Sequence, residues 1–127
     1  EKELEPGGNF GESAIDQARR MAESGALDEA AILRALDKGR REFVVAAIAE
    51  KSGIHQAIVD KVFSLSSAKG IVALTWKSGL SPHLAEQLQT RLGRIAPADR
   101  LKAKSGAFPL SQNEMEWQLE FFGVATS

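Results

Sequence analysis

The sequence contains no cysteine and no tyrosine, and its 127 residues include only six phenylalanines and two tryptophans. Without cysteine, the chain has no disulfide, no cysteine nucleophile and no zinc finger, and the composition fits a reducing compartment. The apolar residues are mostly Ala, Leu, Ile and Val. Because aromatic strand formers are scarce, the composition favours helices over a β-sandwich.

Long apolar stretches and targeting signals are also missing. The longest apolar run covers residues 43–49, whereas a membrane-spanning helix needs about 20 residues. The chain begins with an acidic stretch containing Pro and Gly, which does not resemble a signal peptide. Because there is no initiator methionine, we expect a fragment of a longer cytoplasmic protein. Residues 1–8 are predicted to be a disordered lead-in, and residues 9–127 a single helical domain.

The net charge of −1 hides an uneven distribution. Residues 1–37 carry 4 basic and 9 acidic side chains, which gives −5, and residues 111–127 carry three acids, which gives −3. The segment between them, residues 38–110, carries 12 basic and 5 acidic side chains, which gives +7. A basic middle between acidic ends can attract an anionic partner.

Helical periodicity runs through most of the chain. Apolar residues recur every three or four positions, and no segment alternates with a sustained period of two. We therefore predict an all-α domain of about seven helices, whose ends are marked by capping residues, proline or glycine. The predicted starts are Asn9 with Glu12, Asp28, Arg40 or Arg41, Ser66 or Ser67, Pro82, and Ser111 with Glu114, and the predicted ends are Gly25, Gly39, Gly53 and Gly79.

Two of the predicted helices are short. One contains the apolar residues of segment 58–63. The other is expected over residues 98–104, after Pro97 has ended the preceding helix, which we expect to extend through Ile95.

A repeated Ser-Gly dipeptide is the strongest pattern in the sequence. It occurs at residues 24–25, 52–53, 78–79 and 105–106, with spacings of 28, 26 and 27 residues. Residues 45–63 also align with residues 71–89 without a gap, and apolar positions match apolar positions. A repeating unit of helix, glycine stop and second helix predicts stacked hairpins in a HEAT-like α-solenoid. An irregular helix bundle is the alternative.

The segment EKSGIHQAIVDKV, residues 50–62, has the local pattern of a helix-turn-helix, with Gly53 at the turn. A second helix that reads DNA presents Arg, Lys, Asn or Gln to the bases. Here Lys61 is its only cation and Asp60 would repel phosphate. The same pattern recurs at residues 71–89, so repeat packing explains it better than DNA reading.

We therefore predict a non-enzymatic protein-interaction or scaffold module, whose partner is another protein or the missing part of the same chain. A nucleic-acid or anion-binding domain that uses the basic middle is the alternative. Arg40 and Arg41 would then face an anion, or else pair with Asp37 and Glu42. The candidate contact residues are Arg40, Arg41, Lys61, Arg91 and Arg94.

Catalytic and metal-binding patterns do not emerge from the sequence. His55 and His83 are the only histidines, and two histidines without a third ligand at motif spacing do not predict a metal site. We expect no catalytic residue, no cofactor and no metal.

Two segments resemble a known bacterial family. They are ALDEAAILRALDKGRREFVVAAIAEKSGI at residues 26–54 and AFPLSQNEMEWQLEFFG at residues 107–123. Together they are similar to the C-terminal half of domain-of-unknown-function family 2336. The resemblance implies a helical, repeat-containing cytoplasmic protein longer than this chain, and it implies no activity, cofactor or site residue.

Overall fold

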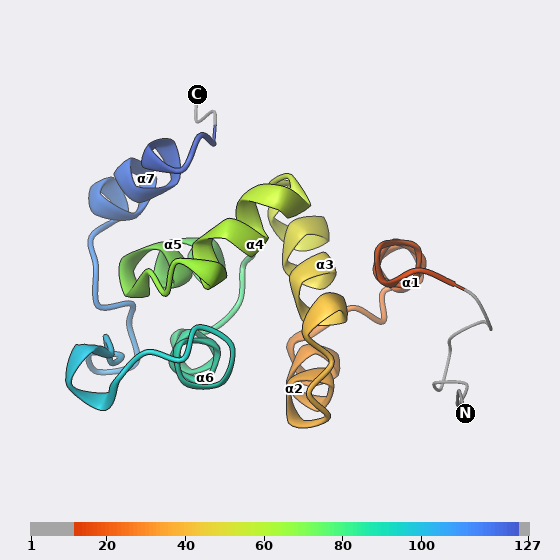
Figure 1. Cartoon of the computed structure of the whole chain (residues 1–127), viewed down its shortest axis with the longest axis horizontal. Helices are drawn as coiled ribbons and strands as arrows, with labels where there is room; N and C mark the ends of the chain where they lie inside the picture. Colours follow the sequence, from red (N-terminus) through yellow and green to blue (C-terminus); the bar gives the residue numbers. More distant parts are fainter. Residues whose placement is uncertain (1–11, 125–127) are drawn as a thin grey trace.

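The computed structural model describes residues 12–124 and shows an all-α fold (Figure 1). The prediction of seven helices is confirmed for this part of the chain, which contains no strand. One short 3-10 helix, η1, lies between the last two α-helices. The elements are α1 (Ala14–Glu23), α2 (Glu29–Asp37), α3 (Arg41–Ser52), α4 (Gln56–Ser64), α5 (Ala68–Lys77), α6 (Pro82–Arg91), η1 (Pro97–Asp99) and α7 (Gln112–Phe121).

Local capping explains where most helices start. As predicted, Asp28, Ser67 and Ser111 cap α2, α5 and α7, and each accepts a hydrogen bond from a backbone N–H of the first turn. Pro82 opens α6 behind the capping Ser81, also as predicted. The predicted glycine ends are confirmed as well. Gly25, Gly39, Gly53 and Gly79 all have φ between +70° and +80°, a conformation that favours glycine.

The predicted start of α1 is wrong. Asn9 lies outside the described residues, and α1 begins only at Ala14, capped by Ser13, whose hydroxyl accepts from the Asp16 N–H at 3.1 Å. The Glu12 carboxylate instead accepts two hydrogen bonds from Arg20, at 2.9 and 3.0 Å. These bonds raise the pKa of Arg20 above its ordinary value. Glu12 thus anchors the chain to the last turn of α1 rather than capping the helix.

Four helices form a row that runs through the molecule. α1 packs on α3, α3 on α5, and α5 on α7, while α4 packs against both α3 and α5 (Figure 1). The centre of the row is the most deeply buried part: residues 43–48 of α3 and residues 70–75 of α5 are all buried. The core is therefore continuous across these helices.

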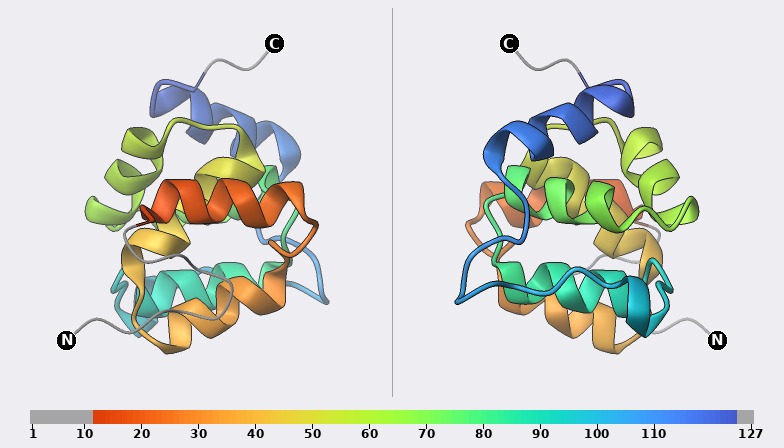
Figure 2. Two further views of the ribbon diagram at one scale, coloured as in Figure 1. Left: turned by 90° about the vertical axis from the view of Figure 1, so that its right-hand side faces the viewer. Right: turned by 90° about the vertical axis from the view of Figure 1, so that its left-hand side faces the viewer.

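The helices α2 and α6 lie side by side and parallel along one flank of this row (Figure 2). At one end, Ser81 donates from its backbone N–H and its hydroxyl to the Glu29 carboxylate, at 2.9 and 2.6 Å. At the other end, Asp37 and Arg91, the last residues of the two helices, form an ion pair. The helices of the pairs α3–α4 and α5–α6 contact each other, and α3 contacts α5, but the predicted HEAT-like solenoid is not confirmed. α2 instead packs on α3 and α6, where a regular solenoid would place α4 between α2 and α6.

The segment after α6 differs from the prediction. α6 ends at Arg91 rather than near Ile95, and residues 98–104 do not form the predicted α-helix. The buried Gln89 side chain explains the difference, because it accepts from the Leu101 N–H at 2.8 Å and donates to the Leu101 carbonyl at 2.9 Å. These bonds hold the backbone at Leu101 in a non-helical conformation against α6.

The fourth Ser-Gly dipeptide does not end a helix. Ser105 and Gly106 have φ of +52° and +80° and form the tight turn between Lys104 and Ala107, whose backbone groups bond to each other at 2.9 Å. This φ pattern, positive at both central residues, is that of a hairpin turn. The repeat of a helix closed by Ser-Gly therefore has three copies in the described residues.

Candidate functional site

Four of the five candidate contact residues come together in one pocket. The pocket has a volume of about 180 Å³ and lies where α2 and α6 end and α3 begins. Lys61, the fifth candidate, is exposed on α4 and is not part of the lining. The lining residues are Leu36, Gly39, Arg40, Arg41, Arg91, Leu92 and Arg94.

Carboxylates orient two of these arginines. The Arg41 guanidinium donates to the Asp60 carboxylate at 2.8 Å and to the Ser64 hydroxyl at 3.4 Å, and both acceptors lie on α4. Arg91 pairs with Asp37 across the α2–α6 contact. The local pairing of Arg41 with Asp37 or Glu42 expected from the sequence is therefore wrong. Residues from a neighbouring helix supply the partners instead.

The other two arginines differ in how firmly they are held. Arg40 donates to the Gln17 side chain at 3.0 Å, a hydrogen bond that ties α1 to the start of α3. Its guanidinium carbon also lies 4.9 Å from the centre of the Phe43 ring, a cation–π contact within α3. Arg94 is exposed and has φ of +53°, and no side-chain hydrogen bond or ion pair holds it within residues 12–124. Arg94 is thus the lining arginine whose guanidinium is available to a ligand.

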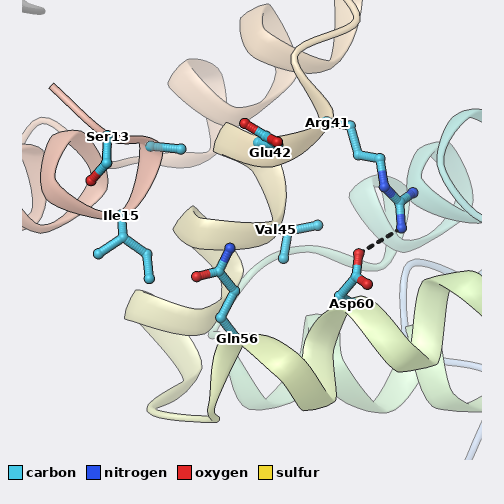
Figure 3. Close-up of a pocket in the computed structure, with 8 residues that line it drawn as sticks. Ser13, Ile15, Arg41, Glu42, Val45, Gln56 and Asp60 are labelled. Carbon is cyan, nitrogen blue, oxygen red and sulfur yellow. Dashed lines mark hydrogen bonds and ion pairs between the residues drawn. The ribbon is translucent and has the colours of Figure 1, made fainter. Parts of the chain in front are cut away.

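A wider depression lies between α1, α3 and α4, on the other side of Arg41 (Figure 3). Its volume is about 480 Å³, and its lining mixes apolar groups such as Ile15 and Val45 with Gln56. The ion pair between Arg41 and Asp60 lies at one edge of it (Figure 3). Arg41 therefore lies between this depression and the pocket lined by Arg40, Arg41, Arg91 and Arg94, which we call the arginine pocket.

A second candidate surface is the outer face of α7. Trp117 is 58% exposed and Phe121 is 69% exposed, and their rings stack with centroids 5.9 Å apart. Met115 and Leu119, which are two residues before each of them, are buried towards the core. Since two residues of an α-helix turn through about 200°, the exposed pair lies opposite the buried one.

The α7 helix is also acidic. It carries Glu114, Glu116 and Glu120 and no basic residue. Glu114 pairs with Lys69 of α5 at 3.1 Å. We call the surface formed by Trp117, Phe121 and these glutamates the α7 face. Neither Trp117 nor Phe121 is among the candidate contact residues predicted from the sequence. Their spacing of four residues, out of phase with Met115 and Leu119, is the signal that identifies them.

The two histidines have unrelated positions. His55 caps α4, where its Nδ1 accepts from the Ala57 N–H at 3.1 Å, and His83 is exposed near the start of α6. Among the described residues, no group of three or more His, Cys, Asp or Glu side chains is arranged to hold a metal ion. No helix within residues 12–124 is long and apolar enough to cross a bilayer.

Comparison with known proteins identifies a family. The profile of the family described as "Uncharacterised protein conserved in bacteria (DUF2336)" matches residues 5–114. The chain belongs to the DUF2336 family. The resemblance seen in the sequence is thus confirmed, although the match ends at residue 114, inside the C-terminal segment on which part of that resemblance was based. No curated protein and no solved structure matches the chain.

Proposed function

We propose that this DUF2336 domain is a non-enzymatic protein-interaction module whose docking surface is the α7 face. The observation that carries the proposal is the exposed, stacked pair Trp117 and Phe121. Large aromatic side chains dominate the binding energy of protein interfaces because each one removes a large apolar area from water.

The position of α7 supports the same proposal. The α1–α3–α5–α7 row ends at this helix, and its inner side packs on α5. A partner helix laid on the outer side would continue the row by the packing that the inner helices already use. The proposed role is that of a HEAT-like scaffold that stacks on a partner.

The charge of the α7 face points to a basic amphipathic helix as the partner. Glu116 directly precedes Trp117 in the helix, and Glu120 directly precedes Phe121. A helix with an apolar stripe flanked by Lys or Arg would cover the aromatic pair and meet the carboxylates. A second copy presenting the same face would bring two acidic surfaces together, even with Glu114 of each copy paired with Lys69, so self-association through this face is disfavoured.

The alternative, duplex DNA held by α3 and α4 as a helix-turn-helix, has weaker support. α3 is buried along residues 43–48, and α4 exposes Asp60 and a single cation, Lys61. Arg41, which reaches α4 from the start of α3, is bound to Asp60. The proposed site of action remains the cytoplasm, in keeping with the absence of cysteine.

The proposal can be tested by crosslinking followed by a binding measurement. Phe121 is replaced by the photo-crosslinking analogue benzoylphenylalanine in bacterial cells, and the captured segment is identified by mass spectrometry. The segment is then synthesised and its affinity for the purified chain is measured by calorimetry. We expect a basic amphipathic segment, and at least a tenfold loss of affinity in the Trp117→Ala variant.

Leu65→Ala is the matched control, because Leu65 is also apolar and 62% exposed but lies at the end of α4. Its affinity for the peptide should stay within about twofold of the parent, in line with near-neutral surface changes. Capture of a second copy, capture of an acidic segment, or equal losses in the Trp117 and Leu65 variants would each refute docking at the α7 face.

A further inference from the structure

A groove along α3 is a second surface, which the proposed function leaves unused. The depression between α1, α3 and α4 and a neighbouring one of about 470 Å³ share Ile15 and Gln56 in their linings, so they form one groove, which we call the α3 groove. We propose that the α3 groove binds a partner helix that carries two basic side chains about two turns apart beside a stripe of large apolar residues. The groove lies at the α1 end of the row and α7 at the other end (Figure 1), so this proposal and docking at the α7 face can fail separately.

The shape of the groove suits a helix. Lining residues on and just after α3 extend from Glu42 to Gly53, which is about 16 Å of helix at 1.5 Å per residue. The helices α1 and α4 form the two walls, and Ile15 and Gln56 project from them (Figure 3). A helix of about three turns would therefore lie along the groove with protein on both sides. It would contact α1, α3 and α4, much as α4 itself contacts α3 and α5.

The small side chains of the floor call for large apolar ones on the partner. Val45 and Ala46 are buried and Ala49 is half-buried, and both alanines end at Cβ. On the α1 wall, Ile15 is 37% exposed. A leucine or isoleucine of the partner would fill the space over the alanines and remove Ile15 from water, which favours binding in proportion to the apolar area covered.

The groove is acidic once its ion pairs are counted. Five Arg, Asp and Glu residues line it, and the two arginines among them are already paired, Arg41 with Asp60 and Arg19 with Asp16. The two side chains that remain are the exposed carboxylates of Glu42 and Glu50. Neither makes a side-chain hydrogen bond or an ion pair within residues 12–124. The groove therefore offers two unpaired negative charges to a partner.

The spacing of the two carboxylates sets the spacing of the partner's cations. Glu42 and Glu50 are eight residues apart on α3, which is a rise of about 12 Å. Two basic residues seven positions apart on a helix share one face and differ by about 10.5 Å, and the long stems of Lys or Arg span the remainder. Glu50 also lies near the C-terminal end of α3, where the helix dipole disfavours a carboxylate. A cation from the partner would offset this unfavourable charge.

The same charges argue against two other occupants. The side chains of residues 1–11 include three acids and one base, which gives −2. The α7 helix of a second copy carries three glutamates and no basic residue. Either would bring like charges to Glu42 and Glu50, so a separate basic helix complements the groove better.

Fluorescence anisotropy with a designed peptide tests the proposal. The probe is a labelled, Ala-rich peptide of about 18 residues, long enough to form a helix in water, with leucines along one face and two lysines seven positions apart beside them. The control peptide has the same composition but carries its lysines on the opposite face. All titrations use the chain with Trp117→Ala, because the α7 face is also proposed to bind a basic helix.

The diagnostic variant is Glu42→Gln with Glu50→Gln, which removes both carboxylates and keeps the shape of the groove. The matched control is Glu23→Gln with Asp99→Asn, which removes the same charge from exposed residues outside the lining. A second diagnostic variant, Ala49→Trp, fills the floor. Thermal melts followed by circular dichroism check that all three fold.

We expect the probe to bind, with about a tenfold loss of affinity in the glutamate variant, in line with two exposed ion pairs. Ala49→Trp should cost at least tenfold, because its ring occupies the space that the leucines need. The control variant should stay within about twofold of the parent. The control peptide should bind about tenfold more weakly than the probe, since its lysines do not reach the glutamates.

Four results of these titrations would overturn the proposal. They are no binding of the probe, equal weakening in the glutamate and control variants, unchanged binding in Ala49→Trp, and equal affinity of the two peptides. Two further measurements address the other occupants. A dimer in sedimentation that Ala49→Trp dissociates would assign the groove to a second copy. At least tenfold tighter binding after Leu4→Ser with Phe10→Ser would assign it to residues 1–11, and we expect a monomer and no such gain.

Discussion

The helices α5 and α7 each have ten residues, yet their surroundings differ completely. In α5, the six residues 70–75 are all buried, because α3, α4, α6 and α7 cover it from several sides. In α7, only Met115, Gln118 and Leu119 are buried within the helix, and two aromatic side chains face solvent. The position of a helix in the row, rather than its apolar content, decides whether its apolar side chains stabilise the fold or remain free for a partner.

The largest loss of stability is expected for a substitution in α5, at the centre of the row of helices. Leu74 of α5 has no exposed surface, so Leu74→Ala should lower the free energy of unfolding by about 2–5 kcal/mol through lost burial and a residual cavity. Urea denaturation followed by circular dichroism measures this, with the slope m used to check that the unfolded state is unchanged. A loss below about 1 kcal/mol would mean that α5 is less enclosed than its neighbours indicate.

A smaller loss of stability is expected for a substitution at Gly70, where α5 meets α7. A Cβ added at Gly70 would lie 2.8 Å from Val62 Cγ1 and 2.9 Å from Phe122 Cε2, so α4 and α7 approach α5 here more closely than a side chain permits. Gly70→Ala should therefore destabilise the fold by about 1–3 kcal/mol. If Phe122 is the obstacle, the double variant with Phe122→Ala should lose less than the sum of the single changes. Additive losses would rule out this contact as the cause.

The smallest effect is expected on the outer side of α7. Trp117→Ala should change the free energy of unfolding by no more than about 1 kcal/mol, because Trp117 is largely exposed and its main contact is the ring of Phe121. The same urea titration measures it. A loss as large as that of Leu74→Ala would make Trp117 a core residue and remove the basis for a docking surface.

Much of the local structure could be predicted from the sequence because its causes are local. A cap such as Asp28 or Ser111 acts on backbone groups two or three residues away, and a glycine such as Gly53 ends a helix through its own backbone freedom. The same reasoning failed at the fourth Ser-Gly dipeptide. Short patterns do not distinguish a helix end from a hairpin turn when both need a positive φ.

The features that the sequence did not reveal depend on distant residues. Nothing near Gln89 indicates that its side chain will bond to the backbone of Leu101 and replace a helix there. The candidate arginines were proposed for their charge alone. Their meeting in one pocket depends on the contact between α2 and α6, whose ion pair joins residues 54 positions apart.

That contact also has a consequence for synthesis of the chain. α2 has nine residues, and isolated helices shorter than about 12–15 residues are marginal in water. Its partners Ser81 and Arg91 are added 52 and 54 residues after Glu29 and Asp37. At about 5–20 residues per second, a 54-residue gap takes roughly 3–11 s. During those seconds α2 of the nascent chain lacks both contacts. A chain whose synthesis stops before α6 would never gain them.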